Sequence, residues 1–340
     1  MNFVSFAANK MSIGTSMKQK LLLSIIALLM QMAGSAQYFS AKNDIWKNRR
    51  HSLSIGLGFS NFLGELGGRD QVGSDFIYDL EWSETRPSLQ AAYRYQFGSR
   101  FYAKGQFAFA IVGGNDALTE EIFRRNRNLN FRSTLFELTA HIEFDVIQFG
   151  QNNQRYNALK RDRKNSAIYI TLGIGAVRFN PKGNLSGTYY SLKPLSTEGQ
   201  GLPDGPEEYS LYSLIIPMGF GYRYELNNDW SIGLEIVHRV TFTDYIDDAS
   251  TVYYDNEIIR QTNGELAAYF ADPSLGYYLD ENTGDRVPLN STFTGAQRGD
   301  PADNDAYFTV MLSGTYVLPY KRYTRGRGRS VKRRKRRAVF

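Results

Sequence analysis

Residues 52–60 read SLSIGLGFS, and this stretch decides the fold. Leu53, Ile55, Leu57 and Phe59 alternate with Ser and Gly, so one side of the segment is apolar and the other is small and polar. Successive side chains of an extended strand point to opposite faces. A strict period of two over this length therefore predicts a β-strand that separates two different environments.

The same alternation recurs seven times further along the chain. We predict the further strands at residues 88–97, 101–112, 130–149, 167–179, 210–226, 230–243 and 306–318. Most are as long as or longer than the roughly 9–11 residues that a tilted membrane strand needs. Short links near Gly98-Ser99 and residues 227–229 alternate with long ones, a habit of outer-membrane barrels. The pattern predicts an all-β fold: an eight-stranded antiparallel transmembrane β-barrel with long extracellular loops and short periplasmic turns.

Composition agrees with this fold and removes several function classes. The 340 residues include 23 Tyr, 22 Phe and 31 Gly but only 10 Pro, a balance that suits strands joined by glycine-containing turns. The mean hydropathy of −0.40 argues against a helical membrane protein. The absence of cysteine excludes disulfides and thiol chemistry, and three histidines are too few for a histidine-rich metal site. We therefore expect no cofactor and no metal.

The N-terminus has the features of an export signal. A basic start at residues 17–20 precedes an apolar run at 21–32 and small residues at 33–36. We expect a signal peptide at 1–36, with Met17 as a possible true start, and a short periplasmic segment at 37–51. No later stretch has the ~20 apolar residues of a spanning helix. The expected location is the outer membrane, with both chain termini in the periplasm and lipid as a partner.

A water-soluble, lipocalin-like barrel would have the same period, with its apolar side chains inside. Two features favour the membrane barrel. The polar faces are mostly Gly, Ser and Thr, which is too little charge for a solvated exterior. The apolar faces also end in aromatic residues such as Tyr93, Tyr222 and Trp230, as at a membrane interface.

If the apolar face meets lipid, the charged residues of the opposite face share the barrel interior. This predicted lumen charge network comprises Arg94, Lys104, Glu137, His141, Glu143, Arg223, Glu235 and Arg239. Eight strands enclose a space that side chains can fill. Buried charges need partners, so we expect acids and bases to pair across the barrel as a structural plug. A proton or ion path is the alternative.

No catalytic residues are predicted. Neither His51, His141 nor His238 is expected to meet a Ser and a carboxylate at the outer rim, so a nucleophilic triad is not supported. Asp244, Asp247 and Asp248 lack the spacing of a calcium loop, and hydrogen bonding within the loop is the preferred interpretation.

The C-terminal tail, residues 319–340, is strongly basic. It has eleven Lys or Arg and no acid between residues 321 and 337, whereas the rest of the mature chain is acidic. An exported protein is not expected to bind nucleic acid or a small-molecule substrate. A disordered periplasmic tail that reaches acidic partners or lipid phosphates is one interpretation, and a solvated tail without a partner is the other. The possible contact residues are Arg329, Lys332, Arg333, Arg334, Lys335, Arg336 and Arg337.

Several short stretches are similar to one protein family. They are SNFLGEL (60–66), RP (86–87) followed by YRY (93–95), GND (114–116), RNLNFRS (127–133), VRFNP (177–181), LSTEGQG (195–201), FTDYIDDAS (242–250) and RGDP (298–301). With these motifs the chain resembles the PorG-type outer-membrane barrels of type IX secretion systems of Bacteroidota.

The resemblance, which spreads over residues 52–318, implies a non-enzymatic part of the secretion apparatus. PorG-like barrels are associated with a periplasmic ring formed by PorK and PorN, and the family has no catalytic residues to transfer. The long basic tail departs from the family pattern. The alternative function is a stand-alone outer-membrane barrel that stabilises the envelope or binds a ligand through its extracellular loops.

Overall fold

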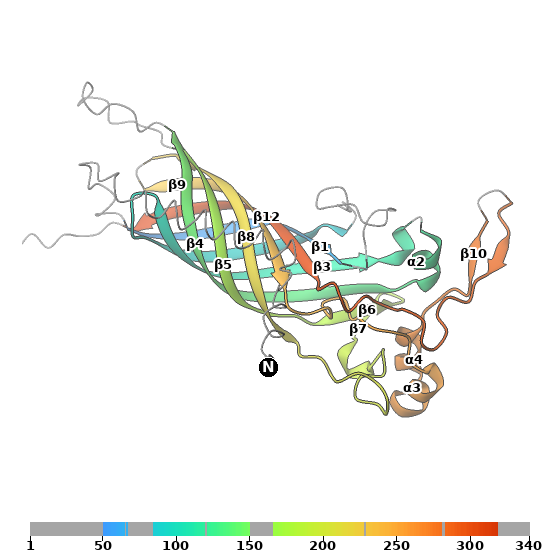
Figure 1. Ribbon diagram of the computed structural model, residues 1–340. Helices are drawn as coiled ribbons and strands as arrows, with labels where there is room; N and C mark the ends of the chain where they lie inside the picture. Colours follow the sequence, from blue (N-terminus) through green and yellow to red (C-terminus); the bar gives the residue numbers. More distant parts are fainter. Residues whose placement is uncertain are drawn as a thin grey trace, which may run out of the picture. The chain divides into compact units, whose positions relative to one another are not determined.

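Eight long strands pair in sequence order and close into a barrel (Figure 1). The computed structural model describes residues 50–64, 66, 84–119, 121–149, 166–227, 229–280 and 283–318. The barrel strands are β1 (His51–Leu63), β2 (Arg86–Gln96), β3 (Phe101–Asn115), β4 (Asn130–Phe149), β5 (Ser166–Arg178), β8 (Tyr212–Glu225), β9 (Trp230–Thr241) and β12 (Ala306–Leu318).

Every neighbouring pair is antiparallel, and the β1–β12 and β3–β4 pairings complete the ring. Closure gives every barrel strand two hydrogen-bonded neighbours, which membranes require of a sheet because lipid offers no hydrogen bonds. The predicted fold is confirmed, with strand bounds within three residues of the expected ones. The predicted signal peptide at 1–36, residues 37–49 and the basic tail at 319–340 lie outside the described residues.

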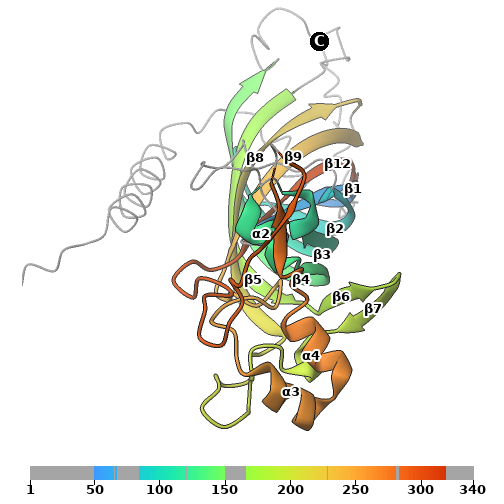
Figure 2. The same ribbon diagram turned by 90° about the vertical axis from the view of Figure 1, so that its right-hand side faces the viewer.

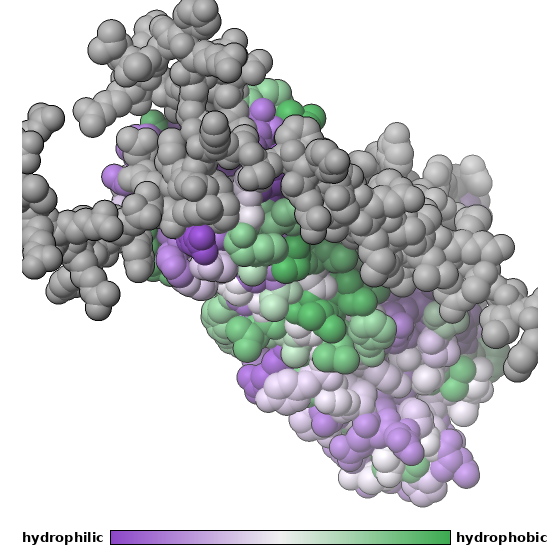
Figure 3. Space-filling model, turned by 60° about the vertical axis from the view of Figure 1, so that its left-hand side comes forward, coloured by the Kyte–Doolittle hydropathy of each residue, from purple (hydrophilic) through white to green (hydrophobic). Residues whose placement is uncertain are grey.

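Apolar side chains cover the outside of the barrel. Ile55 on β1 is 71% exposed and Leu138 on β4 is 70% exposed, whereas Ser54 and Glu137 beside them are buried. Figure 3 shows this belt as a green band across one face of the molecule, with hydrophilic residues on the loop side. A soluble barrel would have the opposite arrangement, so the exterior is suited to lipid.

The height of the belt matches a bilayer core. On β4 the outward-facing residues are apolar from Phe136 to Val146. Ten residue steps of ~3.4 Å at a strand tilt of ~40° give about 26 Å, close to the ~25 Å apolar band of outer-membrane barrels. Aromatic rings lie near its turn-side edge, where Trp230 and Tyr316 have ring centroids 5.0 Å apart. No helix among the described residues is long and apolar enough to cross a membrane.

The two ends of the barrel differ. Short turns follow β2 and β8, and they lie at the same end as the first residues of β1 and the last of β12. The opposite end has the long connections, which contain folded elements that the sequence analysis treats only as loops (Figure 2). These elements are η4 (Asp116–Leu118), α2 (Ile122–Arg127), β6 (Pro181–Leu185), β7 (Thr188–Ser191), η5 (Lys193–Leu195), α3 (Asn256–Asn263), α4 (Glu265–Ala271), β10 (Tyr277–Leu279) and β11 (Arg286–Pro288).

Local signals explain these short elements. The Glu121 side chain accepts hydrogen bonds from the first backbone N–H groups of α2, and the Asp255 side chain does so for α3. Gly264, with φ at 89°, separates α3 from α4. The hairpin β6–β7 extends the sheet, since Lys182 and Pro181 pair with Arg132 and Ser133 of β4. We call the long connections together with these elements the cap.

A hydrophobic core joins the cap to the barrel interior. Inward-facing Phe62, Val112, Leu135 and Ile215 pack with cap residues such as Ile246. Apolar side chains of the loop-side half of the lumen therefore pack against the cap. This core joins the two parts.

Placing a charge in the middle of the lipid-facing belt tests the orientation of the barrel. Leu138→Arg is expected to lower the free energy of unfolding in lipid vesicles by about 2–4 kcal/mol, the usual cost of an arginine at the bilayer midplane. Leu118→Arg, at an exposed position in the cap, is expected to change it by less than about 0.5 kcal/mol. Urea unfolding measures both, and equal effects would contradict a lipid-facing belt.

Candidate functional site

The turn-side half of the lumen contains a layer of buried ion pairs around Glu143. This carboxylate is fully buried and lies 3.3 Å from Nε of Arg94, 3.2 Å from Nζ of Lys104 and 3.9 Å from Nη2 of Arg223. The three cations come from β2, β3 and β8, so the contacts cross the barrel from wall to wall. Because one carboxylate attracts cations from three other strands, it holds these strands together across the lumen at this level.

The remaining predicted charges extend this layer towards the cap. Nζ of Lys104 donates to both carboxylate oxygens of Glu235, at 3.0 and 2.9 Å. Nε of Arg239 donates to Glu137 at 2.7 Å, and Nη1 of Arg239 donates to the Thr309 hydroxyl at 2.8 Å. The structure thus brings seven of the eight predicted residues into ion pairs inside the barrel.

The eighth residue, His141, makes its hydrogen bonds with uncharged groups. Its two ring nitrogens face hydroxyl groups, Thr139 Oγ1 at 2.8 Å and Thr171 Oγ1 at 3.2 Å. His51 contacts the Tyr93 hydroxyl at the turn end, and His238 faces outward on β9. The contacts of His141 and His51 therefore do not include the Ser and carboxylate partners of a nucleophilic triad.

Sequence reasoning missed three members of the layer. Asp145 accepts from Nη2 of Arg223 at 2.9 Å, and that guanidinium lies over the rings of Tyr102 and Tyr169, with Cζ 4.6 and 4.9 Å from their centroids. The signal was present: Asp145 continues the alternation of Glu137 and Glu143, and Tyr102 has the parity of Lys104. Four cations and four carboxylates result, so the layer is balanced in charge.

The cap contains a second buried ionic cluster, built from two of the long connections. Arg298 donates through Nη1 to Glu198 Oε1 at 2.9 Å and to the Asp248 carbonyl at 2.5 Å. Glu198 also accepts from the backbone N–H of Ser250 at 2.8 Å. All of these polar groups are buried. The cluster ties the connection after β5 to both halves of the connection after β9.

The Asp248 carboxylate accepts two further hydrogen bonds of 2.5 Å, from the hydroxyls of Thr197 and Tyr209. Burial raises the pKa of Asp248 to about 6, against the opposing attraction of the Arg298 guanidinium. Burial and the neighbouring Asp248 carboxylate hold the pKa of Tyr209 well above its usual range. Burial thus favours the protonated form of Asp248 at a higher pH than for an exposed aspartate.

A further ion pair links the connection after β3 to this cluster. Asp116 accepts from Nε and Nη2 of Arg127, at 2.7 and 3.1 Å. Nη1 of the same arginine donates to the carbonyl of Arg298 at 2.8 Å. Three of the four long connections therefore share one hydrogen-bonded network.

The aspartates at the end of β9 are hydrogen-bond acceptors in this network. Asp247 accepts from the backbone N–H of Ala249 at 3.0 Å, besides the contacts of Asp248. Within the described part of the chain, no group of three or more acidic or histidine side chains is arranged to hold a metal ion. Hydrogen bonding within the loop is the role that these contacts support.

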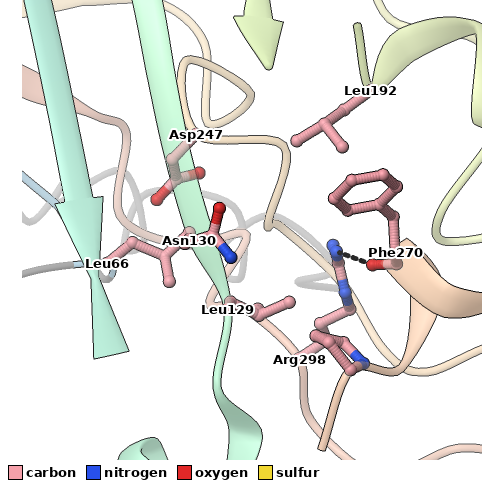
Figure 4. A pocket seen from close by; sticks show the side chains of 8 residues that line it. Leu66, Leu129, Asn130, Leu192, Asp247, Phe270 and Arg298 are labelled. Carbon is pink, nitrogen blue, oxygen red and sulfur yellow. Dashed lines mark hydrogen bonds between the residues drawn. The ribbon is translucent and has the colours of Figure 1, made fainter. Parts of the chain in front are cut away.

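A small pocket lies in the cap beside Arg298 (Figure 4). Leu66, Leu129, Leu192 and Phe270 contribute apolar walls, and Nη2 of Arg298 donates to the Phe270 carbonyl at 3.5 Å. The interior volume is about 10 Å³, which is room for a single water molecule. The pocket is too small for an organic ligand.

The proposed contact residues of the tail, from Arg329 to Arg337, lie outside the described residues.

The fold and its interior define a class: a closed eight-stranded β-barrel of the outer-membrane type, apolar outside and packed inside. Solved structures with some similarity include Neisserial surface protein A (7% identity, TM-score 0.33, covering 79% of this chain and 97% of that chain). Another is Ail of Yersinia pestis, bound to the heparin analogue sucrose octasulfate (12% identity, TM-score 0.30, covering 79% of this chain and 99% of that chain). No family model and no curated protein matches the sequence. At these identities and scores, the similarity does not bear on what this chain does.

Breaking the Arg239–Glu137 pair tests the role of the lumen layer. Arg239 is 1% exposed, so Arg239→Met leaves a buried carboxylate without its cation and is expected to cost about 3–5 kcal/mol of unfolding free energy. The double variant Arg239→Met/Glu137→Leu removes both charges and is expected to recover most of that loss. Urea unfolding of the three proteins measures this, and a double variant as unstable as the single one would count against charge pairing.

The raised pKa of Asp248 predicts the direction of a pH effect. Between its ordinary pKa of 3.8 and its folded value of about 6, the folded chain holds a proton that the unfolded chain has lost. This carboxyl therefore makes stability fall as pH rises from about 4 to 6, by an amount on the order of a few kcal/mol. In Asp248→Asn the contribution is absent, so the fall is smaller. The free energy of unfolding is measured at pH 4, 5, 6 and 7 for the parent, for Asp248→Asn and for Asp303→Asn, an exposed control. The same pH dependence in all three proteins would refute the raised pKa of Asp248.

Proposed function

We propose that this chain is a non-enzymatic component of a type IX protein secretion apparatus, an outer-membrane barrel that anchors PorK/PorN-like ring proteins. In this proposal the turn end of the barrel, where β1 begins and β12 ends, faces the periplasm. The cap then faces outward. The barrel acts as a fixed part to which other proteins attach.

The proposal rests on the observation that several of the PorG-like motifs meet in the cap. Glu198, Asp248 and Arg298 belong to the stretches 195–201, 242–250 and 298–301, which are far apart in sequence and bonded together in the cap. Asp116 and Arg127, from 114–116 and 127–133, join the same network. Proteins of one family with a common cap are expected to share the residues that build its buried network. The position of the motifs in this network therefore supports the resemblance.

The filled interior supports a structural role. Ion pairs around Glu143 occupy the turn-side half of the lumen, and the hydrophobic core and the Arg239–Glu137 pair lie in the loop-side half. Side chains can fill the interior of an eight-stranded barrel in this way. A packed interior supports a function carried by the surfaces of the barrel, at its rims or through its tail.

A stand-alone barrel whose loops bind an external ligand is the second candidate, and one feature of the cap favours it. Leu118, Ile122 and Phe123 are exposed on η4 and α2, with exposed fractions of 42–60%. Exposed apolar side chains that lie close together often contact another molecule. In this function the partner lies outside the cell and the periplasmic ring is not involved.

Deleting the gene in its natural host distinguishes the two functions. The secretion role predicts that cargo carrying the C-terminal secretion signal accumulates inside the cell, and that affinity-tagged barrel from solubilised membranes brings the ring proteins with it. Normal secretion in the deletion strain would remove the first candidate.

The tail is tested in the same strain. A variant with Arg329, Lys332 and residues 333–337 replaced by Gln keeps the barrel and removes seven positive charges. If the tail contacts an acidic ring protein, recovery of that protein falls at least about tenfold while the barrel level stays unchanged. Substitution of Arg125, Arg260 and Arg286 by Gln in the cap is the control and is expected to leave recovery unchanged.

A further inference from the structure

Three basic side chains cluster on the outside of the barrel at the loop-side edge of the apolar belt. Arg132 on β4, Arg178 at the end of β5 and Lys182 on β6 alternate with inward-facing neighbours, so their side chains are on the outer face. Arg178 is exposed, and Arg132 and Lys182 are half-buried. None of the three belongs to the lumen layer or to the cap network.

The strand register places Arg132 and Lys182 next to each other, with Arg178 opposite a position four residues along β4 from Arg132, and it places aromatic rings beside these cations. Arg132 pairs directly with Lys182 in the antiparallel β4–β6 ladder. Arg178 stands between Phe136 on β4 and Tyr212 on β8. The guanidinium of Arg132 also lies over the ring of Tyr189, 5.5 Å from its centroid.

No acidic residue in the described part of the chain forms an ion pair with this cluster. Among the residues that the structure describes, Arg132, Arg178 and Lys182 form no ion pair, although most other buried or half-buried arginines in the protein do. Like charges directly opposite each other in a ladder destabilise it. An anion between Arg132 and Lys182 would turn this repulsion into attraction.

The height of the cluster identifies where such an anion would come from. Phe136, opposite Arg178, is the last exposed apolar residue of β4 before Thr134 and Arg132. The belt therefore ends at this row, and the three cations lie at the level of the lipid headgroups. Tyr212 and Tyr189 beside them are exposed and are suited to the same interface.

We propose that Arg132, Arg178 and Lys182 form a binding site for the phosphates of a glycolipid headgroup in the leaflet on the loop side. Arginine binds phosphate through two parallel N–H donors, and lysine adds a compact charge. Three cations spread over three adjacent strands suit a headgroup with more than one phosphate. The acyl chains of the same lipid would lie along Phe136, Leu138 and Leu214, which are exposed below the cluster.

Titration of the detergent-solubilised full chain with lipid A, followed by native mass spectrometry, tests the site. Lipid A carrying both phosphates is expected to bind more tightly than phosphatidylglycerol and than lipid A from which the phosphates have been removed. Arg132→Gln/Arg178→Gln/Lys182→Gln is expected to weaken binding by at least about tenfold, since charge-assisted contacts are lost. The control is Arg125→Gln/Arg260→Gln/Arg286→Gln, which removes three exposed arginines from the cap and should bind within about twofold of the parent.

The heat-induced shift in electrophoretic mobility shows whether each variant is folded. If the folded triple variant binds lipid A as tightly as the parent, or if dephosphorylated lipid A or phosphatidylglycerol binds equally well, the proposal is overturned.

A single variant adds a readout that does not depend on lipid affinity. Without lipid A, Arg132→Gln is expected to raise the melting temperature because it removes the repulsion from Lys182, and with saturating lipid A it is expected to lower it. A decrease in both conditions would contradict the repulsive pair.

Discussion

Pairing of charges inside a barrel that faces lipid is the constraint on which the rest of this structure depends. Once apolar residues occupy the outward positions, the alternate positions of every strand point into a space closed to water. A charge placed there must meet an opposite charge across the lumen. Glu143 does so with cations from three strands, and the balanced layer around it joins opposite walls of the barrel.

Buried charges are also paired in the cap, although loops rather than strands surround them there. Arg298, Glu198 and Asp248 are buried by loops rather than by strands, and their bonds replace the ladders that regular structure would provide. Apolar residues such as Phe62 and Ile246 fill the space between the two ionic layers. Barrel and cap are thus one packed body from the lumen layer to the Arg298 cluster. The outside of the barrel differs, because there Arg132 and Lys182 stand opposite each other and neither forms an ion pair with a described residue.

Much of this could be predicted from the sequence, because strand periodicity is a strong signal. The eight strands and the inward parity of residues such as Lys104 and Arg239 follow from an alternation that also decides their environment. Asp145, Tyr102 and Tyr169 have the same inward parity, so the alternation alone was enough to place them in the lumen as well. The cap could not be predicted in this way. Its elements are three to eight residues long, too short for a period, and the bonds among Glu198, Asp248 and Arg298 join positions that are 50 to 100 residues apart. The cluster at Arg132 depends on β6 pairing with β4, which no local pattern indicates.

The central claim is that the outward positions contact acyl chains while the inward ones are buried among charges. The chain has no cysteine, so single cysteines along β4 from Leu135 to Phe144 can each carry a nitroxide in lipid vesicles. Collision rates with oxygen, which concentrates in the bilayer, should be high at 136, 138, 140, 142 and 144 and low at the positions between them. A water-soluble nickel reagent should reach neither set. High accessibility to the nickel reagent at 138 and 142, without an oxygen maximum, would contradict the account.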